Sequence, residues 1–353
     1  MGKGPLIVLT GPTAAGKTAL SVKLARKVNG EIISADSMQV YRHMDIGSAK
    51  IRPEEMQEIR HYMIDLLEPT EEFNVVVFQK YARKYIEEIH SRGHVPILVG
   101  GTGFYIQSVL YDIDFTENEE NTPLRASLEQ LAAEKGNVYL HQKLFEVDPK
   151  AAEDIHENNR KRVIRALEFY ELTGKRISEH NSMQRQKASA YASCYFVLND
   201  IREKLYERID RRVDRMLADG LVNEVSSLLA MGCKRTDTAM QGLGYKEILD
   251  YLNGEITLEQ AIYRIKRDTR HFAKRQLTWF RREKDVIWVN KPDFDYDEEK
   301  MLDFMLACYF KQLDKTGQPE ANTPLQATGY QTCSAVENRK GKSTGELEKW
   351  REK

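Results

Sequence analysis

Cysteine is scarce in this sequence, and its spacing excludes two classes of site. The 353 residues include four cysteines, which lie far apart: Cys194, Cys233, Cys308 and Cys333. No two of them form a C-x-x-C pair, the spacing typical of zinc and redox sites, and they do not resemble the dense cysteine framework of a small disulfide-stapled domain. We therefore expect reduced thiols, no zinc site and no disulfide framework.

Long hydrophobic runs are also missing. No stretch approaches the ~20 apolar residues that a membrane-spanning helix needs. The first residues, Met1 to Pro5, lead directly into a strand-like run without the pattern of a signal peptide. From these two absences we expect a cytoplasmic protein with no membrane partner.

The sequence has almost no net charge. It carries 53 basic and 54 acidic residues, a formal charge of -1, with 41% hydrophobic and 30% charged residues. This composition is ordinary for a globular protein and excludes a disordered or fibrous chain. The balance does not by itself indicate a nucleic-acid partner, because that would require basic residues gathered on one part of the surface. The length favours a main domain plus an insertion or a second small domain.

Short, nearly continuous apolar runs predict a buried parallel sheet. Such runs are typical of strands covered by helices on both faces. They occur at residues 6–10, 31–35, 62–66, 95–99, 195–198 and 286–289. Apolar residues at helical spacing follow the first run, in residues 17–28. The predicted fold class is α/β, a parallel sheet flanked by helices, which the glycine-bearing G-x-x-x-x-G-K-[ST] loop after its first strand makes P-loop NTPase-like.

Helical, charged sequence interrupts the strands. Pro123 to Lys135 and Asn158 to Thr173 are the clearest helices, with Gly136 and Gly174 as breaks. A long helix is also predicted from Thr257 to Lys284. We divide the chain into a core of residues 1–112 and 194–313, a helical insertion of residues 113–193, and a polar, nonperiodic tail of residues 314–353 that we expect to be disordered.

One motif indicates a phosphate site. The first strand ends in a G-x-x-x-x-G-K-[ST] sequence that opens a helix: Gly11, Pro12, Thr13, Ala14, Ala15, Gly16, Lys17 and Thr18. In such a loop backbone N–H groups and the helix N-terminus bind phosphate oxygens, the lysine adds a charge and the threonine hydroxyl can bind Mg²⁺. The alternative is a plain tight turn. The motif does not distinguish a nucleotide from a bare pyrophosphate group.

A carboxylate follows the second strand. Asp36 lies at the carboxyl end of that strand, the edge where parallel sheets bind ligands. It fits a general base for a nucleophile that attacks near a bound phosphate ester. An N-cap at the start of a helix is an equally good explanation for an aspartate at this position.

Taken together, these motifs resemble those of bacterial tRNA dimethylallyltransferases, also called tRNA isopentenyltransferases. The resemblance runs from about Pro5 to Asn290 and rests on the phosphate loop and on four further blocks: residues 36–41 (DSMQVY), 44–50 (MDIGSAK), 100–105 (GGTGFY) and 208–217 (RIDRRVDRML). Residues 274–279 (KRQLTW) are similar to a later block of the same family. The resemblance implies transfer of the dimethylallyl group of dimethylallyl diphosphate to N6 of the tRNA adenine next to the anticodon, with release of diphosphate.

The resemblance also implies roles for individual residues. Asp36 would engage N6 of the adenine, Lys17 and Thr18 would hold the diphosphate with Mg²⁺, and Arg212 would stabilise the departing diphosphate. Contacts with tRNA would involve Asp36, Ser37, Met38, Gln39, Thr102, Arg125, Lys161, Arg162, Val163, Ile164 and Arg165. The partners would then be tRNA and dimethylallyl diphosphate, and we expect a monomer.

Two basic segments suit an RNA substrate. One is residues 160–165 in the insertion, where lysine and arginine predominate. The other is residues 264–284, which contain nine lysines and arginines but only two acidic residues. Such clusters neutralise backbone phosphates, although a solvated helix face is the commoner meaning of a single charged run. Two rival functions share the phosphate loop: a small-molecule or nucleotide kinase, and an RNA-binding module with a nucleotide switch.

Overall fold

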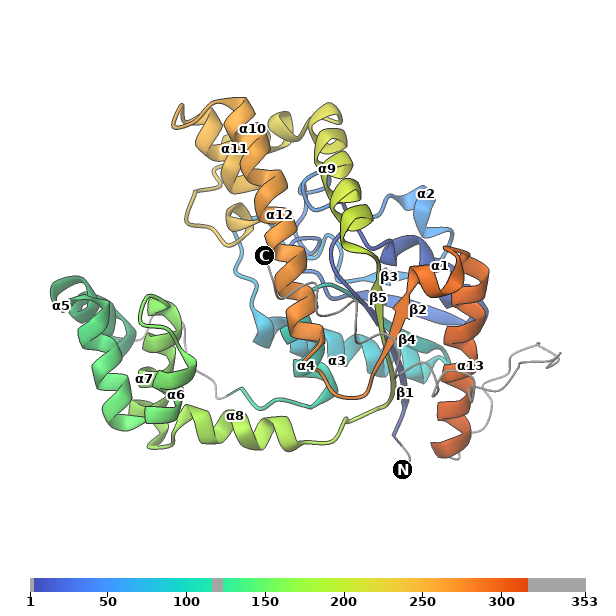
Figure 1. Cartoon of the computed structure of the whole chain (residues 1–353), viewed down its shortest axis with the longest axis horizontal. Coiled ribbons are helices and arrows are strands. Elements are labelled where there is room, and N and C mark those ends of the chain that lie inside the picture. The colour runs from blue at the N-terminus through green and yellow to red at the C-terminus, as the bar shows by residue number, and fades with distance from the viewer. Residues whose placement is uncertain (1–2, 116–122, 317–353) are drawn as a thin grey trace. The chain divides into compact units, whose positions relative to one another are not determined.

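The computed structural model describes residues 3–115 and 123–316, and the chain forms two compact units (Figure 1). The larger unit holds the residues up to Val109 and those from Tyr191 onward. The smaller unit spans Leu110–Ala190, where the sequence predicted an insertion of residues 113–193. Residues 192 and 193 belong to a strand of the larger unit. Each unit is described below by itself.

A six-stranded, all-parallel sheet forms the centre of the larger unit, which confirms the predicted fold class. The strand order is β3-β2-β4-β1-β5-β6, so β1 lies inside the sheet with β4 and β5 as neighbours. The strands are β1 (Pro5–Thr10), β2 (Gly30–Ser34), β3 (His61–Tyr62), β4 (Val95–Gly100), β5 (Ala192–Asn199) and β6 (Val286–Asn290). All six expected runs contribute a strand.

The predicted strand at residues 62–66 is wrong beyond its first residue. β3 ends at Tyr62, because Met63 and Asp65 adopt left-handed backbone angles (φ 65° and 51°) that a strand does not allow. The segment instead lies beside the loop that comes after β2. The backbone N–H groups of Asp65 and Leu66 donate to the carbonyls of Gln39 and Val40 in that loop. The apolar run therefore supports the loop that follows β2.

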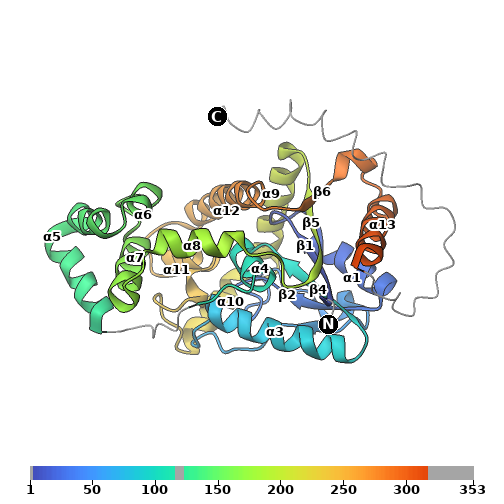
Figure 2. The ribbon, with the colours of Figure 1, turned by 90° about the horizontal axis from the view of Figure 1, so that it is seen from below.

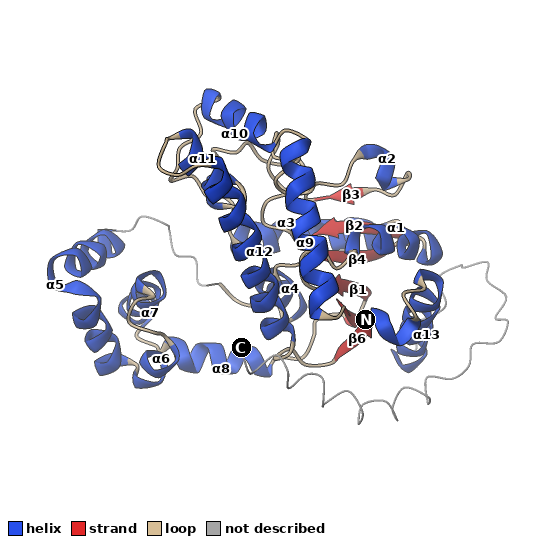
Figure 3. Cartoon of the chain, turned by 45° about the horizontal axis from the view of Figure 1, so that its top comes forward, coloured by secondary structure: helices blue, strands red, loops and turns tan. Residues whose placement is uncertain are grey.

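Helices cover both faces of the sheet (Figure 3). α1 (Lys17–Val28) and α13 (Glu298–Thr316) pack on one face, where Leu20, Leu24 and Met305 meet Ile7 and Leu9 of β1 in a buried cluster. The other helical elements of this unit are α2 (Pro53–Met56), α3 (Val75–Ser91), α4 (Gly103–Leu110), α9 (Arg202–Ala218), α10 (Leu221–Ala230), η1 (Ala239–Gln241), α11 (Tyr245–Leu252), α12 (Leu258–Phe280) and η2 (Lys291–Phe294).

In the smaller unit, the regular elements among the described residues are all helices (Figure 2). They are α5 (Pro123–Val147), α6 (Pro149–Asp154), α7 (Arg160–Thr173) and α8 (Ile177–Gln186). Gly136 breaks α5 with a left-handed φ of 84°, and Gly174 ends α7 at φ 67°, as the sequence predicted. This unit has its own hydrophobic core, in which Leu140, Leu144 and Val163 are buried.

Three helix boundaries differ from those expected, one of them the start of α7, which lies at Arg160 rather than Asn158. The long helix α12 begins after Thr257, whose hydroxyl caps it by accepting from the Gln260 N–H, but it ends at Phe280 rather than Lys284. The final helix α13 buries Leu313 and extends to Thr316, past the expected start of the tail. The rest of that tail, residues 317–353, lies outside the described residues. Among the residues described, no helix is long and apolar enough to cross a membrane.

Candidate active site

The phosphate loop connects β1 to α1, in the sheet context that the motif requires. Gly11 adopts φ 142°, and a Cβ atom there would lie 2.2 Å from the Leu198 carbonyl oxygen, so only glycine fits. Gly16 is the N-cap of α1 with φ 90°, and no side chain caps the helix. The first N–H groups of α1 are thus available to an anion.

Lys17 is the first residue of α1 and turns back over the loop. Its ammonium donates to the carbonyl oxygens of Gly11 and Pro12 at 3.0 and 2.9 Å. The pKa of Lys17 is lowered to about 8: burial is the largest cause, the charge of Arg212 acts in the same direction, and the charge of Asp36 opposes both. Lys17, Arg212 and Asp36 therefore lie within electrostatic reach of one another.

Two arginines of α9 contact the phosphate loop. The Arg208 Nε donates to the Ala14 carbonyl at 2.9 Å, and its Nη2 lies 2.6 Å from the buried carboxylate of Asp200. One turn later, the Arg212 Nη1 donates to the Thr13 hydroxyl at 3.2 Å. α9 therefore brings Arg212 to the loop, whereas Arg208 fixes the loop's backbone.

Asp36 follows β2 and is half-buried. Its Oδ1 accepts from the Met38 backbone N–H at 2.9 Å, so it does stabilise a local turn, but no helix begins there. Its charge also raises the pKa of Tyr105, although burial is the larger cause. Because no helix begins directly after Asp36, the N-cap alternative is wrong for this position.

The predicted contact residues beside Asp36 divide into two kinds. Ser37 and Met38 form the half-buried turn after Asp36. The Gln39 side chain accepts from the Ser34 hydroxyl at 3.0 Å and donates toward the Ser48 and Ala49 carbonyls at 3.5 and 3.4 Å. Gln39 therefore connects two segments of this loop.

The glycine-rich turn after β4 packs against other parts of the protein. A Cβ at Gly101 would lie 2.2 Å from the Gln276 Nε2, and one at Gly103 would lie 2.3 Å from the Trp279 ring. Half-buried Thr102 donates its N–H to the Ala35 carbonyl at 3.3 Å, directly before Asp36. The turn thus places Thr102 beside Asp36.

Gln276 of α12 joins this turn to the phosphate loop. Its side chain is buried, accepts from the Thr13 N–H and donates to the Gly101 carbonyl, each at 2.9 Å. One amide thus satisfies a backbone group in each loop and fixes the distance between them.

Glu224 of α10 holds the loop that follows Asp36. Its carboxylate accepts from three consecutive backbone N–H groups, those of Asp45, Ile46 and Gly47, at 2.9, 2.7 and 3.0 Å. The Tyr245 hydroxyl donates to the same carboxylate at 2.7 Å. Burial and this carboxylate raise the pKa of Tyr245. The motif at residues 44–50 is therefore shaped by a partner far away in the sequence.

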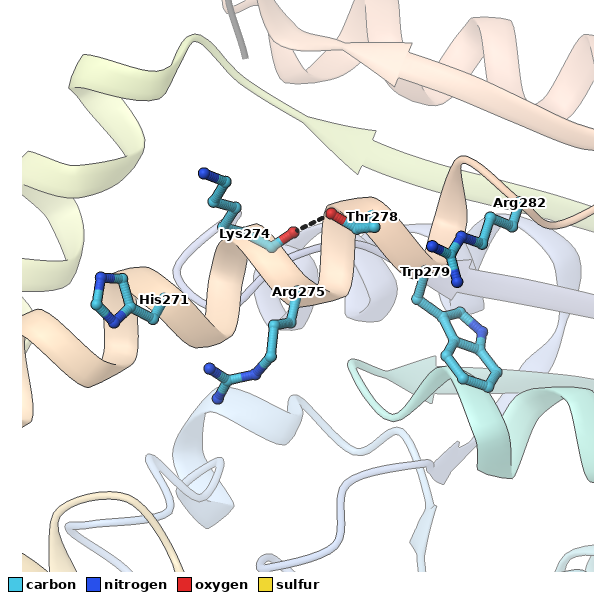
Figure 4. A pocket seen from close by; sticks show the side chains of 6 residues that line it. All are labelled: His271, Lys274, Arg275, Thr278, Trp279 and Arg282. Carbon is cyan, nitrogen blue, oxygen red and sulfur yellow. Dashed lines mark hydrogen bonds between the residues drawn. The ribbon is translucent and has the colours of Figure 1, made fainter. Parts of the chain in front are cut away.

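The basic helix α12 presents a hollow along one face (Figure 4). Its volume is about 360 Å³, and it is lined by His271, Lys274, Arg275, Thr278, Trp279 and Arg282. Nearer the start of the helix the cations form ion pairs: Arg264 with Asp250, Lys266 with Asp214, Arg267 with Asp268 and Arg270 with Asp210. The lining of the hollow includes three basic side chains, those of Lys274, Arg275 and Arg282.

Within the smaller unit, the predicted contact residues also differ in exposure. Lys161 and Arg162 are exposed on α7. Val163 and Ile164 are buried in the core, so their side chains do not reach the surface, which corrects the expectation for these two. The buried carboxylate of Glu168 pairs with Arg125 at 2.6 Å and lies 3.9 Å from Arg165. This pairing gives Arg125 and Arg165 a structural role in the unit.

The sequence analysis did not identify three residues that position the loops of this site: Arg208, Gln276 and Glu224. Arg208 and Gln276 lie inside blocks that carried the resemblance, which was the available signal. Glu224 stands in an ordinary amphipathic helix, and nothing in its neighbourhood predicted a contact with residues 45–47.

Comparison with known proteins identifies the family. The family described as IPP transferase matches residues 39–283. The chain is 59% identical over 311 residues to a tRNA dimethylallyltransferase of Lachnoclostridium phytofermentans, covering 88% of this chain and 99% of the relative. It is 53% identical over 306 residues to that of Acetivibrio thermocellus, covering 86% and 98%.

Solved structures agree. A full-length tRNA isopentenylpyrophosphate transferase of Bacillus halodurans matches with a TM-score of 0.68 and 43% identity, covering 90% of this chain and all of that one. A eukaryotic dimethylallyltransferase acting on tRNA matches with a TM-score of 0.76 and 29% identity, covering 95% and 83%. With these likenesses added to the phosphate loop, Asp36 and Arg212, the chain belongs to the tRNA dimethylallyltransferase family.

Proposed function

We propose that the protein transfers the dimethylallyl group of dimethylallyl diphosphate to N6 of the adenine next to the anticodon of a tRNA. The observation that carries this proposal is the cluster of Lys17, Arg212 and Asp36, in which two cations at a phosphate loop lie within electrostatic reach of one carboxylate. Cations and a base are the groups that such a transfer needs.

The chemistry assigns each group a step. The exocyclic amine of adenine is a weak nucleophile, because its lone pair is delocalised into the ring, so it needs a proton acceptor and an aligned electrophile. As N6 forms its bond to the allylic carbon, Asp36 accepts the amine proton. The carbon–oxygen bond breaks and its electron pair leaves with the diphosphate. Lys17, Arg212 and the loop N–H groups stabilise that charge.

Mg²⁺ fits this site through the diphosphate. Among the described residues, no three or more His, Cys, Asp or Glu side chains are grouped so that they could hold a metal. Mg²⁺ usually keeps several waters and binds substrate phosphates with few protein ligands. The hydroxyl of Thr18, an exposed residue on the first turn of α1, would be such a ligand. When bound, the ion neutralises charge on the diphosphate.

The alternative function is that of a kinase, which transfers a phosphoryl group from ATP. Two labelled substrates distinguish it from dimethylallyl transfer. We expect label in the allyl group of dimethylallyl diphosphate to enter tRNA, and label in the terminal phosphate of ATP to stay out of it. Phosphate label in tRNA or in a small acceptor, with no allyl label in tRNA, would contradict the proposal.

We further propose that the protein acts as a monomer, which light scattering of the free protein would test.

The low pKa of Lys17 predicts a pH dependence. A lysine at its ordinary pKa stays charged through neutral and mildly alkaline pH, whereas Lys17 loses its proton as the pH rises through about 8. Because the neutral amine attracts diphosphate less, we expect kcat/KM for dimethylallyl diphosphate to fall above about pH 8. The measurement is kcat/KM between about pH 7 and 9.5. A flat profile through this range would show that Lys17 does not act as a charge.

The exposed cations of α7 predict a salt effect on tRNA binding. If Lys161 and Arg162 pair with backbone phosphates, each phosphate neutralised should contribute roughly 0.7 to 0.9 to the slope of log Kd for tRNA against log salt concentration. Lys161→Ala/Arg162→Ala should therefore flatten the slope and raise KM for tRNA, with turnover at saturating tRNA preserved. We prefer this pair to one with Arg165, because Arg165 lies close to the buried Glu168.

A control with the same charge change is available in this unit. Lys135 and Lys143 of α5 lie over the Tyr139 ring at 4.7 and 5.8 Å, and replacing both by alanine also removes two charges. The measurement is tRNA binding over a salt series. If the two double variants have equal slopes, α7 has no special contact with RNA.

A further inference from the structure

A lysine far from the motif lies against the phosphate loop. Lys291 begins η2, directly after β6. A Cβ atom built at Gly16 would lie 3.0 Å from the Lys291 ammonium, so this cation contacts the residue that caps α1. Gly16 is the loop residue next to Lys17. A second lysine therefore reaches the anion-binding end of α1.

The backbone that carries Lys291 is fixed by its neighbours. The Asn290 side chain accepts from Asn199 of β5 and donates to Asp293, each at 3.1 Å. The Tyr296 N–H donates to the Lys291 carbonyl, also at 3.1 Å. These bonds hold the end of β6 beside the loop, so the approach of Lys291 to Gly16 follows from a fixed backbone.

The strand order determines the side from which Lys291 arrives. In the order β3-β2-β4-β1-β5-β6, the phosphate loop follows β1, Asp36 follows β2 and Lys291 follows β6. Asp36 and Lys291 therefore approach the loop from opposite sides of β1. A ligand with its reacting carbon near Asp36 has its far end toward Lys291.

The charges near Lys291 are already paired with other groups. Burial and the charge of Arg208 lower the pKa of Lys291, while Asp200 and Glu298 raise it. Asp200 pairs with Arg208 at 2.6 Å and Glu298 with Lys23 at 2.7 Å. Within the described residues, the Lys291 ammonium makes no hydrogen bond or ion pair. A half-buried ammonium without such a partner is unfavourable, and an anionic ligand would satisfy it.

We propose that Lys291 binds the terminal phosphate of the diphosphate, while Lys17 and Arg212 bind the phosphate attached to the allyl group. The assignment rests on the proposed function of the phosphate loop. The terminal phosphate is the one farther from the reacting carbon, which matches the side of the loop that Lys291 occupies. Lys291 is thus a binding residue for the diphosphate, additional to the phosphate-loop motif.

Binding of inorganic pyrophosphate tests this directly. We expect Lys291→Ala to weaken pyrophosphate binding, measured by calorimetry with Mg²⁺ present, by about 10- to 100-fold, the loss typical of a hydrogen bond to a charged group. Lys291→Arg should retain most of the affinity. The matched control is Lys300→Ala, which removes an exposed lysine that pairs with Asp295 at 3.2 Å. Wild-type affinity in Lys291→Ala would overturn the proposal.

Kinetics test which phosphate is bound. Lys291→Ala should raise KM for dimethylallyl diphosphate by a similar factor and leave kcat and tRNA affinity within a few-fold, because the terminal phosphate lies away from the breaking bond. A fall in kcat with unchanged KM would overturn the assignment to the terminal phosphate.

Lys17→Ala separates this inference from the proposed function. If pyrophosphate binding is lost in Lys17→Ala but not in Lys291→Ala, the phosphate loop binds diphosphate and the inference about Lys291 fails. If neither substitution affects binding, the assignment of the phosphate loop fails with it.

Discussion

Asp36→Asn is expected to lower kcat by about 100- to 10,000-fold, the range typical of losing a general base. The amide cannot accept the N6 proton, yet its oxygen can still accept the Met38 N–H that Asp36 now accepts at 2.9 Å. The local turn should therefore persist, and affinities for tRNA and dimethylallyl diphosphate should change little. The measurement is single-turnover transfer at saturating substrates.

Asp36→Ala serves as the control for the turn. It removes both the base and the hydrogen bond to Met38, so it should lose as much activity as Asp36→Asn and some thermal stability as well. If Asp36→Asn retained near-normal turnover while Asp36→Ala did not, Asp36 would support the turn and another group would accept the proton.

Arg212→Ala is expected to lower kcat by about 100- to 1,000-fold, as when one donor to a developing negative charge is removed. Burial lowers the pKa of Arg212 and the charge of Asp36 raises it, so the guanidinium lies close to both the loop and the base. Because charge on the diphosphate grows as the bond breaks, the loss should fall on kcat more than on KM. Arg212→Lys should recover part of the activity.

Arg211 offers a matched control one position away. It lies on the same helix but is exposed, and it pairs with Glu207 one turn earlier. Arg211→Ala removes the same charge from the same helix, so a general electrostatic effect would appear in both variants. Equal turnover in the two variants would remove Arg212 from the reaction.

Local patterns in the sequence predicted the parts of the site that depend on short-range geometry. The phosphate loop is one such part, because its glycines, lysine and threonine act through a backbone turn of eight consecutive residues. The apolar runs predicted every strand of the sheet, and Gly136 and Gly174 marked real breaks in the helices. Each of these signals lies within a few residues of the structure that it forms.

Long-range contacts were beyond reach of the sequence. Gln276 bonds to Thr13 and Gly101 across 263 and 175 residues, and Glu224 meets Asp45 across 179. The run after Tyr62 had the hydrophobicity of a strand, but tertiary bonds turned it into a loop. Val163 and Ile164 were assigned to RNA contact as part of one segment, although helical periodicity placed their side chains in the core.

The most direct test of the account is the stoichiometry between two products of one reaction. After incubation of the protein with Mg²⁺, dimethylallyl diphosphate and tRNA, the diphosphate released is measured together with the N6-dimethylallyl adenosine recovered from digested tRNA. The account predicts equal amounts of the two, and a strong fall of both in Asp36→Asn. Diphosphate release without modified adenosine, or orthophosphate in its place, would contradict it.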